Sequence, residues 1–220
     1  MQATLLSIAK EAGTPKLFRA GSSLYFQGEV PRDVCVIQDG IVRGYSITNG
    51  GDERILSFYS KGDILPLAWA LGGASAAFSY YEAVNDTRVI MIEKSKFTNL
   101  CETRPEFIQS VLRASGREYT GATLRIMSLT QSRTIDKLTY SLYYLAYRFG
   151  IERPNGETLI NMKLSQITLA TMIGQTREGT ARNLKELVDK KAVSYKGSSY
   201  QVHMDRLLAL LGEEDFRKLV

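Results

Sequence analysis

Residues 164–190 read LSQITLATMIGQTREGTARNLKELVDK, and this stretch decides the fold of the C-terminal half of the chain. Ser165 can cap an apolar first helix, and Gly174 can end that helix in the left-handed conformation. Thr176 can cap a second helix that contains Leu184 and Leu187. Two helices joined by a short turn that contains glycine are typical of a helix-turn-helix unit.

A two-stranded hairpin is predicted directly after the second helix. Residues 192–195 and 200–202 read as short strands, and Lys196-Gly197-Ser198-Ser199 between them is a turn sequence. A hairpin in this position would be the wing of a winged helix.

The second helix carries side chains suited to reading DNA bases. Arg177, Glu178 and Arg182 fall within its first turn and a half. In a major groove, arginine pairs with guanine O6 and N7, and glutamate accepts from cytosine N4. The simpler alternative is a solvated helix face with intrahelical ion pairs. The glycine turn, the wing and the basic charge together favour DNA reading.

Four neighbouring residues are expected to hold DNA phosphates, because their amide, hydroxyl or ammonium groups can donate hydrogen bonds to phosphate oxygens. These residues are Gln175, Thr176, Lys196 and Ser198.

Charge is unevenly distributed along the 220 residues, whose net charge is +5. Residues 1–103 contain 10 Lys and Arg against 11 Asp and Glu, whereas residues 104–220 contain 18 against 12. A basic C-terminal half suggests a polyanionic partner. A solvated surface rich in lysine and arginine would give the same counts.

The N-terminal part alternates short strands and turns. Runs such as VCVIQ, IVRGYSI and TRVIMI are rich in β-branched and aromatic residues. Turn signals separate them at intervals of roughly ten residues, and Asn49-Gly50 is the strongest hairpin signal. Regular short strands with glycine corners suggest a small closed barrel or roll.

A long helix is predicted from Glu106 to about Gln131. Its apolar and small residues are separated alternately by four and three positions, which is the heptad spacing of a seam that needs a partner helix. The alternative is a stripe that packs on its own domain, but seven consecutive matches favour self-association. The seam residues are Ile108, Leu112, Ser115, Tyr119, Ala122, Ile126 and Leu129.

A further helix is predicted from Ile135 to Phe149, after the polar break at residues 131–133. We expect Gly150 to end it. A short strand is expected around Thr158 to Met162. The apolar stripe of this helix consists of Leu138, Leu142, Leu145, Ala146 and Phe149.

The chain as a whole resembles the cyclic-AMP-receptor/fumarate-nitrate-regulator (Crp/Fnr) family of bacterial transcription factors. The resemblance rests on the roll rhythm around Gly28-Glu29, Gly40, Gly50 or Gly51 and Lys61-Gly62-Asp63, on the helix opened by Arg104-Pro105-Glu106, and on Gly174-x-x-Arg177-Glu178-x-x-x-Arg182. It implies an α+β fold in three parts. Residues 1–103 would form a β-roll sensor domain, a cyclic-nucleotide-binding-like double-stranded β-helix. Residues 104–131 would form the dimerisation helix, and residues 132–220 a winged helix-turn-helix DNA-binding domain.

The function that this resemblance implies is sequence-specific regulation of transcription by a homodimer on a pseudo-palindromic operator. The expected partners are double-stranded DNA, a second copy of the chain, RNA polymerase and a small-molecule effector. A regulator controlled only by its abundance, without any effector, is the alternative.

Three residues of the second helix depart from the family's pattern. The family commonly has apolar residues where this chain has Thr180 and Asn183, and a hydroxyl residue where it has Gly179. Glycine within a helix lowers helix stability by about 1 kcal/mol, and here it also removes a DNA-contacting side chain. We therefore expect an operator that differs from the family's usual TGTGA-like half-site.

The effector is not expected to be cyclic AMP. Cyclic-nucleotide-binding members of the family hold the phosphate with an Arg-Ser pair, but the matching segment here, residues 77–81, reads AFSYY without arginine. A buried cyclic phosphate needs a charged or multi-donor partner. Residues that could instead line a small-molecule pocket are Leu65, Leu67, Trp69, Tyr80 and Tyr81, although they could equally fill the core of the roll. The two states of such a switch are expected to differ near residues 131–136.

Other functional classes find little support. Cys35 and Cys101 are too few for a disulfide scaffold, a cysteine-only zinc site or an iron–sulfur cluster, although Cys101 could sense redox state. The single histidine, His203, lies after the wing and is expected to be a plain surface or packing residue. Without a Ser/His/Asp set, a P-loop or a metal-ligand pair, we expect no catalysis, no metal and no cofactor. The sequence offers no secretion signal or membrane span, which favours the cytoplasm.

Overall fold

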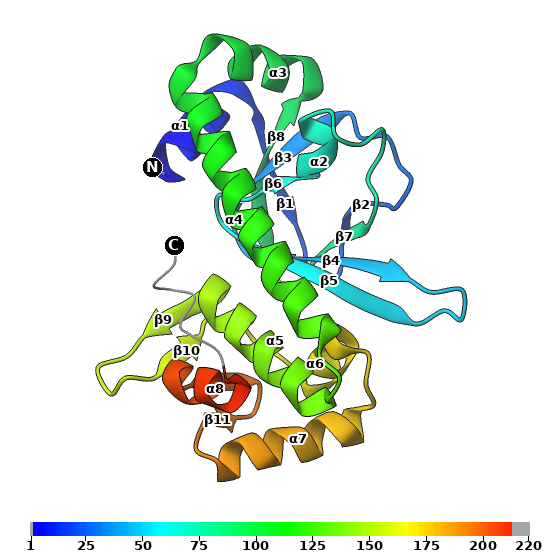
Figure 1. The fold of residues 1–220 in the computed structure, drawn as a ribbon. Helices are drawn as coiled ribbons and strands as arrows, with labels where there is room; N and C mark the ends of the chain where they lie inside the picture. The colour runs from blue at the N-terminus through cyan, green and yellow to red at the C-terminus, as the bar shows by residue number, and fades with distance from the viewer. Residues whose placement is uncertain (1, 213–220) are drawn as a thin grey trace. The chain divides into compact units, whose positions relative to one another are not determined.

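The computed structural model describes residues 2–212, and the chain divides into a first unit that ends at Thr120 and a second that begins at Gly121. The expected α+β fold, with an N-terminal sheet domain, a long helix and a C-terminal helix-turn-helix domain, is confirmed. Figure 1 traces the elements of each unit along the chain. Helix α4 (Pro105–Thr130) begins in the first unit and ends in the second.

Two four-stranded antiparallel sheets build the first unit. One has the order β1-β8-β3-β6 and the other the order β2-β7-β4-β5. The strands of the first sheet are β1 (Thr14–Phe18), β8 (Thr87–Glu93), β3 (Asp33–Asp39) and β6 (Ile64–Leu65). Those of the second are β2 (Ser23–Tyr25), β7 (Tyr80–Ala83), β4 (Val42–Ile47) and β5 (Glu53–Tyr59). The helices of this unit besides α4 are α1 (Gln2–Ala12), α2 (Leu67–Ala70) and α3 (Lys94–Thr103).

Neighbouring residues of β3 face two different cores. Val34 and Val36 pack with residues of α1, α3 and α4, whereas Cys35 and Ile37 pack with the other sheet. Both faces of the strand are buried, so its sequence is a continuous apolar run instead of an alternating one. We call the second core the roll interior; it consists of Phe18, Leu24, Tyr25, Cys35, Ile37, Val42, Tyr59, Leu65, Ala77, Tyr81, Ala83 and Val89.

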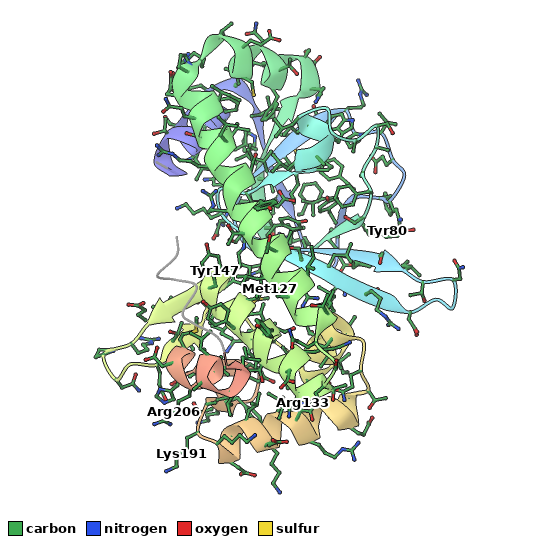
Figure 2. All side chains as sticks on the ribbon, viewed as in Figure 1. Tyr80, Met127, Arg133, Tyr147, Lys191 and Arg206 are labelled. Carbon is green, nitrogen blue, oxygen red and sulfur yellow. The ribbon has the colours of Figure 1, made fainter. Side chains whose placement is uncertain are left out.

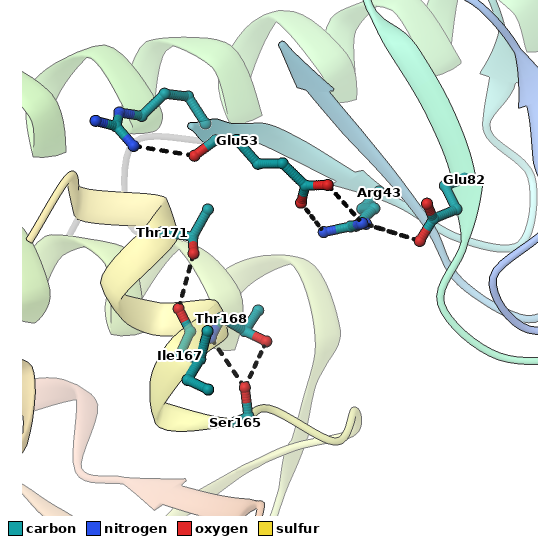
Figure 3. A network of polar contacts seen from close by, with 8 residues as sticks. Arg43, Glu53, Glu82, Ser165, Ile167, Thr168 and Thr171 are labelled. Carbon is teal, nitrogen blue, oxygen red and sulfur yellow. Dashed lines mark hydrogen bonds and ion pairs between the residues drawn. The ribbon is translucent and has the colours of Figure 1, made fainter. Parts of the chain in front are cut away.

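The hairpin predicted at Asn49-Gly50 joins β4 to β5. Thr48 N donates to Asp52 O at 2.9 Å, and Gly51 takes the positive φ of 86° that the turn requires. Outside the turn, Arg43 of β4 forms two ion pairs, one with Glu53 of β5 at 2.7 Å and one with Glu82 of β7 at 3.0 Å (Figure 3). Cross-strand ion pairs of this kind stabilise the sheet.

Helix α5 (Thr134–Phe149) forms the centre of the second unit, and all five residues of its predicted stripe are buried. Around it lie α6 (Gln166–Ile173), α7 (Arg177–Asp189), α8 (Met204–Leu211) and a sheet of order β11-β12-β10-β9. The sheet strands are β9 (Gly150–Glu152), β10 (Thr158–Ile160), β11 (Val193–Lys196) and β12 (Ser199–Val202).

Gly150 ends α5, as expected. Its φ is −73° and its ψ is 141°, so the chain passes directly into the extended strand β9. A Cβ at this position would lie 2.1 Å from Ala146 O and 2.4 Å from Thr158 Cγ2. Glycine is required here because two segments approach closely, not because φ is positive.

Helix α8, which the sequence pattern did not predict, follows the wing. Lys191 lies in the turn after α7 with a φ of 55°, and the Arg206 guanidinium of α8 donates to its carbonyl oxygen at 2.7 Å; both side chains are labelled in Figure 2. Within residues 2–212, no helix combines the length and the apolar character that crossing a bilayer requires.

Candidate nucleic-acid interface

Local capping interactions define the two helices of the helix-turn-helix. Ser165 Oγ accepts a hydrogen bond from Thr168 N at 2.9 Å at the start of α6 (Figure 3). Gly174 ends α6 in the left-handed conformation, with φ 65° and ψ 42°. Thr176 Oγ1 then accepts from Gly179 N at 3.2 Å and caps α7. All three expected caps are confirmed, and each satisfies a backbone group that the helix leaves unpaired.

Helix α7 has one buried and one exposed face. Leu184 and Leu187 are buried, whereas Arg177, Glu178 and Arg182 are exposed. Among the residues that the structure describes, none forms an ion pair with these three side chains. The intrahelical ion pairs weighed as the simpler alternative are therefore not formed, and the charged groups are available to a ligand.

The four residues expected to contact phosphate lie at the turn before α7 and at the wing. Thr176 and Lys196 are exposed, and Gln175 and Ser198 are half-buried. Ser198 O accepts from Leu164 N at 2.9 Å, which ties the tip of the wing to the segment before α6. This hydrogen bond between main-chain groups fixes the wing to the helix-turn-helix.

Two of the unusual polar residues of α7 have hydrogen-bond partners. Thr180 is fully buried, and its Oγ1 donates to Thr176 O at 3.0 Å, which explains why a hydroxyl is tolerated there. Asn183 Nδ2 lies 3.1 Å from Thr134 Oγ1 and 3.3 Å from Gln175 Oε1. Asn183 therefore links the start of α5 to the turn before α7.

Arg125 of α4 is a structural residue of the second unit that sequence reasoning missed. Its side chain is only 3% exposed. Its guanidinium donates to Ser141 Oγ at 3.1 Å and to Met172 O at 2.8 Å, and it lies 5.7 Å from the centre of the Tyr144 ring. Burial lowers the pKa of this guanidinium. The sequence signal for this structural role is that Arg125 is a single arginine in an otherwise apolar stretch of the helix.

Five of the seven predicted seam residues of α4 are exposed. Leu112 is 61% exposed, Tyr119 76% and Ile126 62%, and Leu129 and Ala122 are exposed as well. Ile108 and Ser115, the other two seam residues, are half-buried, and Ile108 packs against the core of the first unit. The opposite side of the helix, with Phe107 and Val111, is fully buried.

The five residues suggested for an effector pocket do not lie together. Leu65 and Tyr81 belong to the roll interior, whereas Leu67 and Trp69 pack in the other core, against α1, α3 and α4. Tyr80 belongs to neither core; it is labelled in Figure 2, and its ring stacks on Tyr45 with a centroid distance of 5.2 Å. The strand alternation of β7 separates Tyr80 from Tyr81.

Both cysteines are free thiols. Cys35 is fully buried, and burial raises the pKa of its thiol. Burial also raises the pKa of the half-buried Cys101 thiol, which keeps it protonated and weakly reactive. His203 Nε2 lies 3.2 Å from Glu157 Oε1, so this histidine packs against the β9–β10 hairpin.

Two family models match successive parts of this chain. The model of the cyclic nucleotide-binding domain matches residues 15–104, and the model of the Crp-like helix-turn-helix domain matches residues 136–210. The chain belongs to the Crp/Fnr family. Like other Crp/Fnr proteins, it is a DNA-binding transcription regulator with a helix-turn-helix domain.

Similarity to individual Crp/Fnr proteins extends over most of the chain. The fumarate and nitrate reduction regulatory protein of Vibrio cholerae is 25% identical over 83% of this chain and 72% of its own. The structure of FixK2 from Bradyrhizobium japonicum superposes with a TM-score of 0.75 at 19% identity, over 93% of this chain and 98% of FixK2. The c-di-GMP-responsive regulator CLP of Xanthomonas campestris gives a TM-score of 0.72 at 14% identity, over 92% and 99% of the two chains.

Proposed function

We propose that this regulator acts in the cytoplasm as a homodimer on a pseudo-palindromic operator. The observation that carries the proposal is the exposed apolar face of α4. Exposed apolar side chains at heptad spacing are stable in water when a second helix covers them. Two copies joined along α4 would present two α7 helices to half-sites about one DNA turn apart, roughly 34–36 Å.

In this proposal the exposed charged groups of α7 read DNA bases, and residues of the wing and of the turn before α7 contact the DNA backbone. Arg177 and Arg182 would pair with guanines, and Glu178 would accept from a cytosine. Gln175, Thr176, Lys196 and Ser198 would contact phosphates. The exposure of the three charged side chains on α7, without ion pairs to other described residues, supports this division. RNA polymerase is the expected protein partner of such a regulator, and no catalytic activity is proposed.

Replacing Arg177 and Lys196 one at a time tests this division. We expect Arg177→Ala to weaken binding to the selected operator by about 1–3 kcal/mol and to relax the preference at one base position. We expect Lys196→Ala to weaken operator and random duplex alike and to lower the salt slope by about one. The measurement is fluorescence anisotropy against an operator selected from random duplexes, repeated at several salt concentrations. Equal losses of both variants on both duplexes would contradict the assignment.

We further propose that the roll does not take cyclic AMP. Tyr81 packs between Tyr25 and Tyr59 in the roll interior, with ring centroids 6.1 and 5.7 Å apart. Residues 77–81, which match the segment that holds the phosphate in cyclic-nucleotide-binding members of the family, contain no arginine that could neutralise a cyclic phosphate.

Isothermal titration of the full chain with cyclic AMP should therefore show no heat of binding at micromolar concentration. Binding at that strength would contradict the proposal and favour the alternative, a regulator gated by a cyclic nucleotide or another small molecule in an atypical pocket. The same titration with c-di-GMP tests that alternative with the ligand to which CLP of Xanthomonas campestris responds.

A further inference from the structure

The side-chain amide of Gln175 lies over the first turn of α7, in space that a side chain at position 179 would need. A Cβ built on Gly179 would lie 2.8 Å from Gln175 Nε2 and 3.0 Å from Gln175 Cδ. Real Cβ atoms do not approach other atoms so closely, so any other residue at 179 would displace the amide. The glycine thus makes room for a neighbouring side chain.

Asn183 fixes the orientation of that amide. Its Nδ2 donates to Gln175 Oε1 at 3.3 Å and to Thr134 Oγ1 at 3.1 Å. Because Oε1 of Gln175 is the acceptor in this contact, the two N–H groups of Nε2 remain for another acceptor. Gln175 is half-exposed and adjoins Thr176, the N-cap of α7, where backbone N–H groups and the helix dipole favour an anion.

We propose that Gln175, Gly179 and Asn183 form one DNA-contacting unit, in which the Gln175 amide takes the place of a side chain at position 179 and donates to a phosphate oxygen of the duplex. The proposal rests on the proposed function and deepens it. It gives a single reason for two departures of α7 from the family pattern, since Gly179 makes room for the amide and Asn183 orients it. The phosphate contact is then made from the turn before the helix instead of from the helix itself.

A double-mutant cycle on DNA binding tests the coupling. Gln175→Ala should weaken binding to operator and random duplex alike by about tenfold, which corresponds to one hydrogen bond to a charged acceptor. The salt slope should stay unchanged, because a neutral amide releases no counterion. Gly179→Ala should cause the same loss by displacing the amide, and the double variant should be no weaker than either single variant.

A hydroxyl at position 179 should replace the missing donor. We therefore expect Gly179→Ser in the Gln175→Ala background to recover most of the tenfold loss. Additive losses in the cycle, or a Gly179→Ala variant that binds like the wild type, would overturn the proposal. A Gln175→Ala loss confined to one base pair would overturn the phosphate contact in favour of base reading.

Thermal unfolding tests the same unit without DNA. In the Gln175→Ala background the new Cβ has only one close contact left, Thr176 Oγ1 at 3.2 Å, so Gly179→Ala adds a better helix former and should raise the unfolding midpoint by up to about 4 °C. In the wild-type background the displaced amide loses its hydrogen bond from Asn183 Nδ2, which should offset part of this gain. Gly116→Ala in α4 is the matched control, because a Cβ there meets nothing within 4 Å, so its effect should be the same in both backgrounds. Equal effects of Gly179→Ala in both backgrounds would overturn the proposed arrangement of Gln175, Gly179 and Asn183. A wild-type protein that binds no DNA would overturn only the proposed function.

Discussion

Ile126→Glu should convert the protein into a monomer and lower its affinity for a two-half-site operator at least about 100-fold. In the proposed dimer, two glutamates would face each other across the seam, where burial of unpaired like charges is costly. In the single chain Ile126 is 62% exposed, so the substitution should leave the fold of each unit intact. The large effect on DNA follows because linking two binding modules raises overall affinity by about 10²–10⁴-fold, and a monomer loses that gain.

Light scattering and operator binding, measured on the same preparations, check this result. Leu112→Glu should behave in the same way, because Leu112 belongs to the same exposed face of α4. Gln109→Glu is the matched control: it makes the same change in charge at an exposed position of the same helix outside the seam, and it should remain dimeric. A dimeric Ile126→Glu protein with unchanged affinity would show that α4 does not join the two copies.

The helix-turn-helix was predictable from sequence because its determinants are local. Ser165, Gly174 and Thr176 act within three or four residues of their own positions, and each cap is present as expected. The seam of α4 was readable for the same reason, since heptad spacing is a property of one helix. Five of its seven residues are exposed in the single chain, whereas Ile108 packs against the core of the first unit.

Features that depend on close approach between distant segments were not predictable. Gly150 was expected only as the residue that ends a helix, whereas a Cβ there would lie 2.1 Å from Ala146 O and 2.4 Å from Thr158 Cγ2 of β10. The suggested pocket failed to come together because Leu65 and Leu67 lie on either side of the sheet in different cores. Composition identifies these residues as apolar, but the packing of strand β6 and helix α2 decides which core each one enters.

Arg125→Glu should destabilise the second unit by about 4 kcal/mol or more, which is the range of buried unpaired charges. The guanidinium of Arg125 donates to Met172 O, in the last turn of α6, where the helix dipole places partial negative charge. A carboxylate at this position would lose the hydrogen bonds to Met172 and Ser141 and add repulsion from the carbonyl end of α6.

Arg125→Met separates the charge of this side chain from its volume. It removes two hydrogen bonds from a charged donor, and it also removes the cost of burying that charge, so we expect a net loss of only about 1–2 kcal/mol. Hydrogen exchange of the α6 and α7 amides measures the stability of the second unit. Fluorescence of Trp69, the only tryptophan of the chain, reports the first unit and serves as the internal control. If Arg125→Met protects these amides better than the wild type does, the buried guanidinium is a net cost, and α6 is held by its apolar contacts alone.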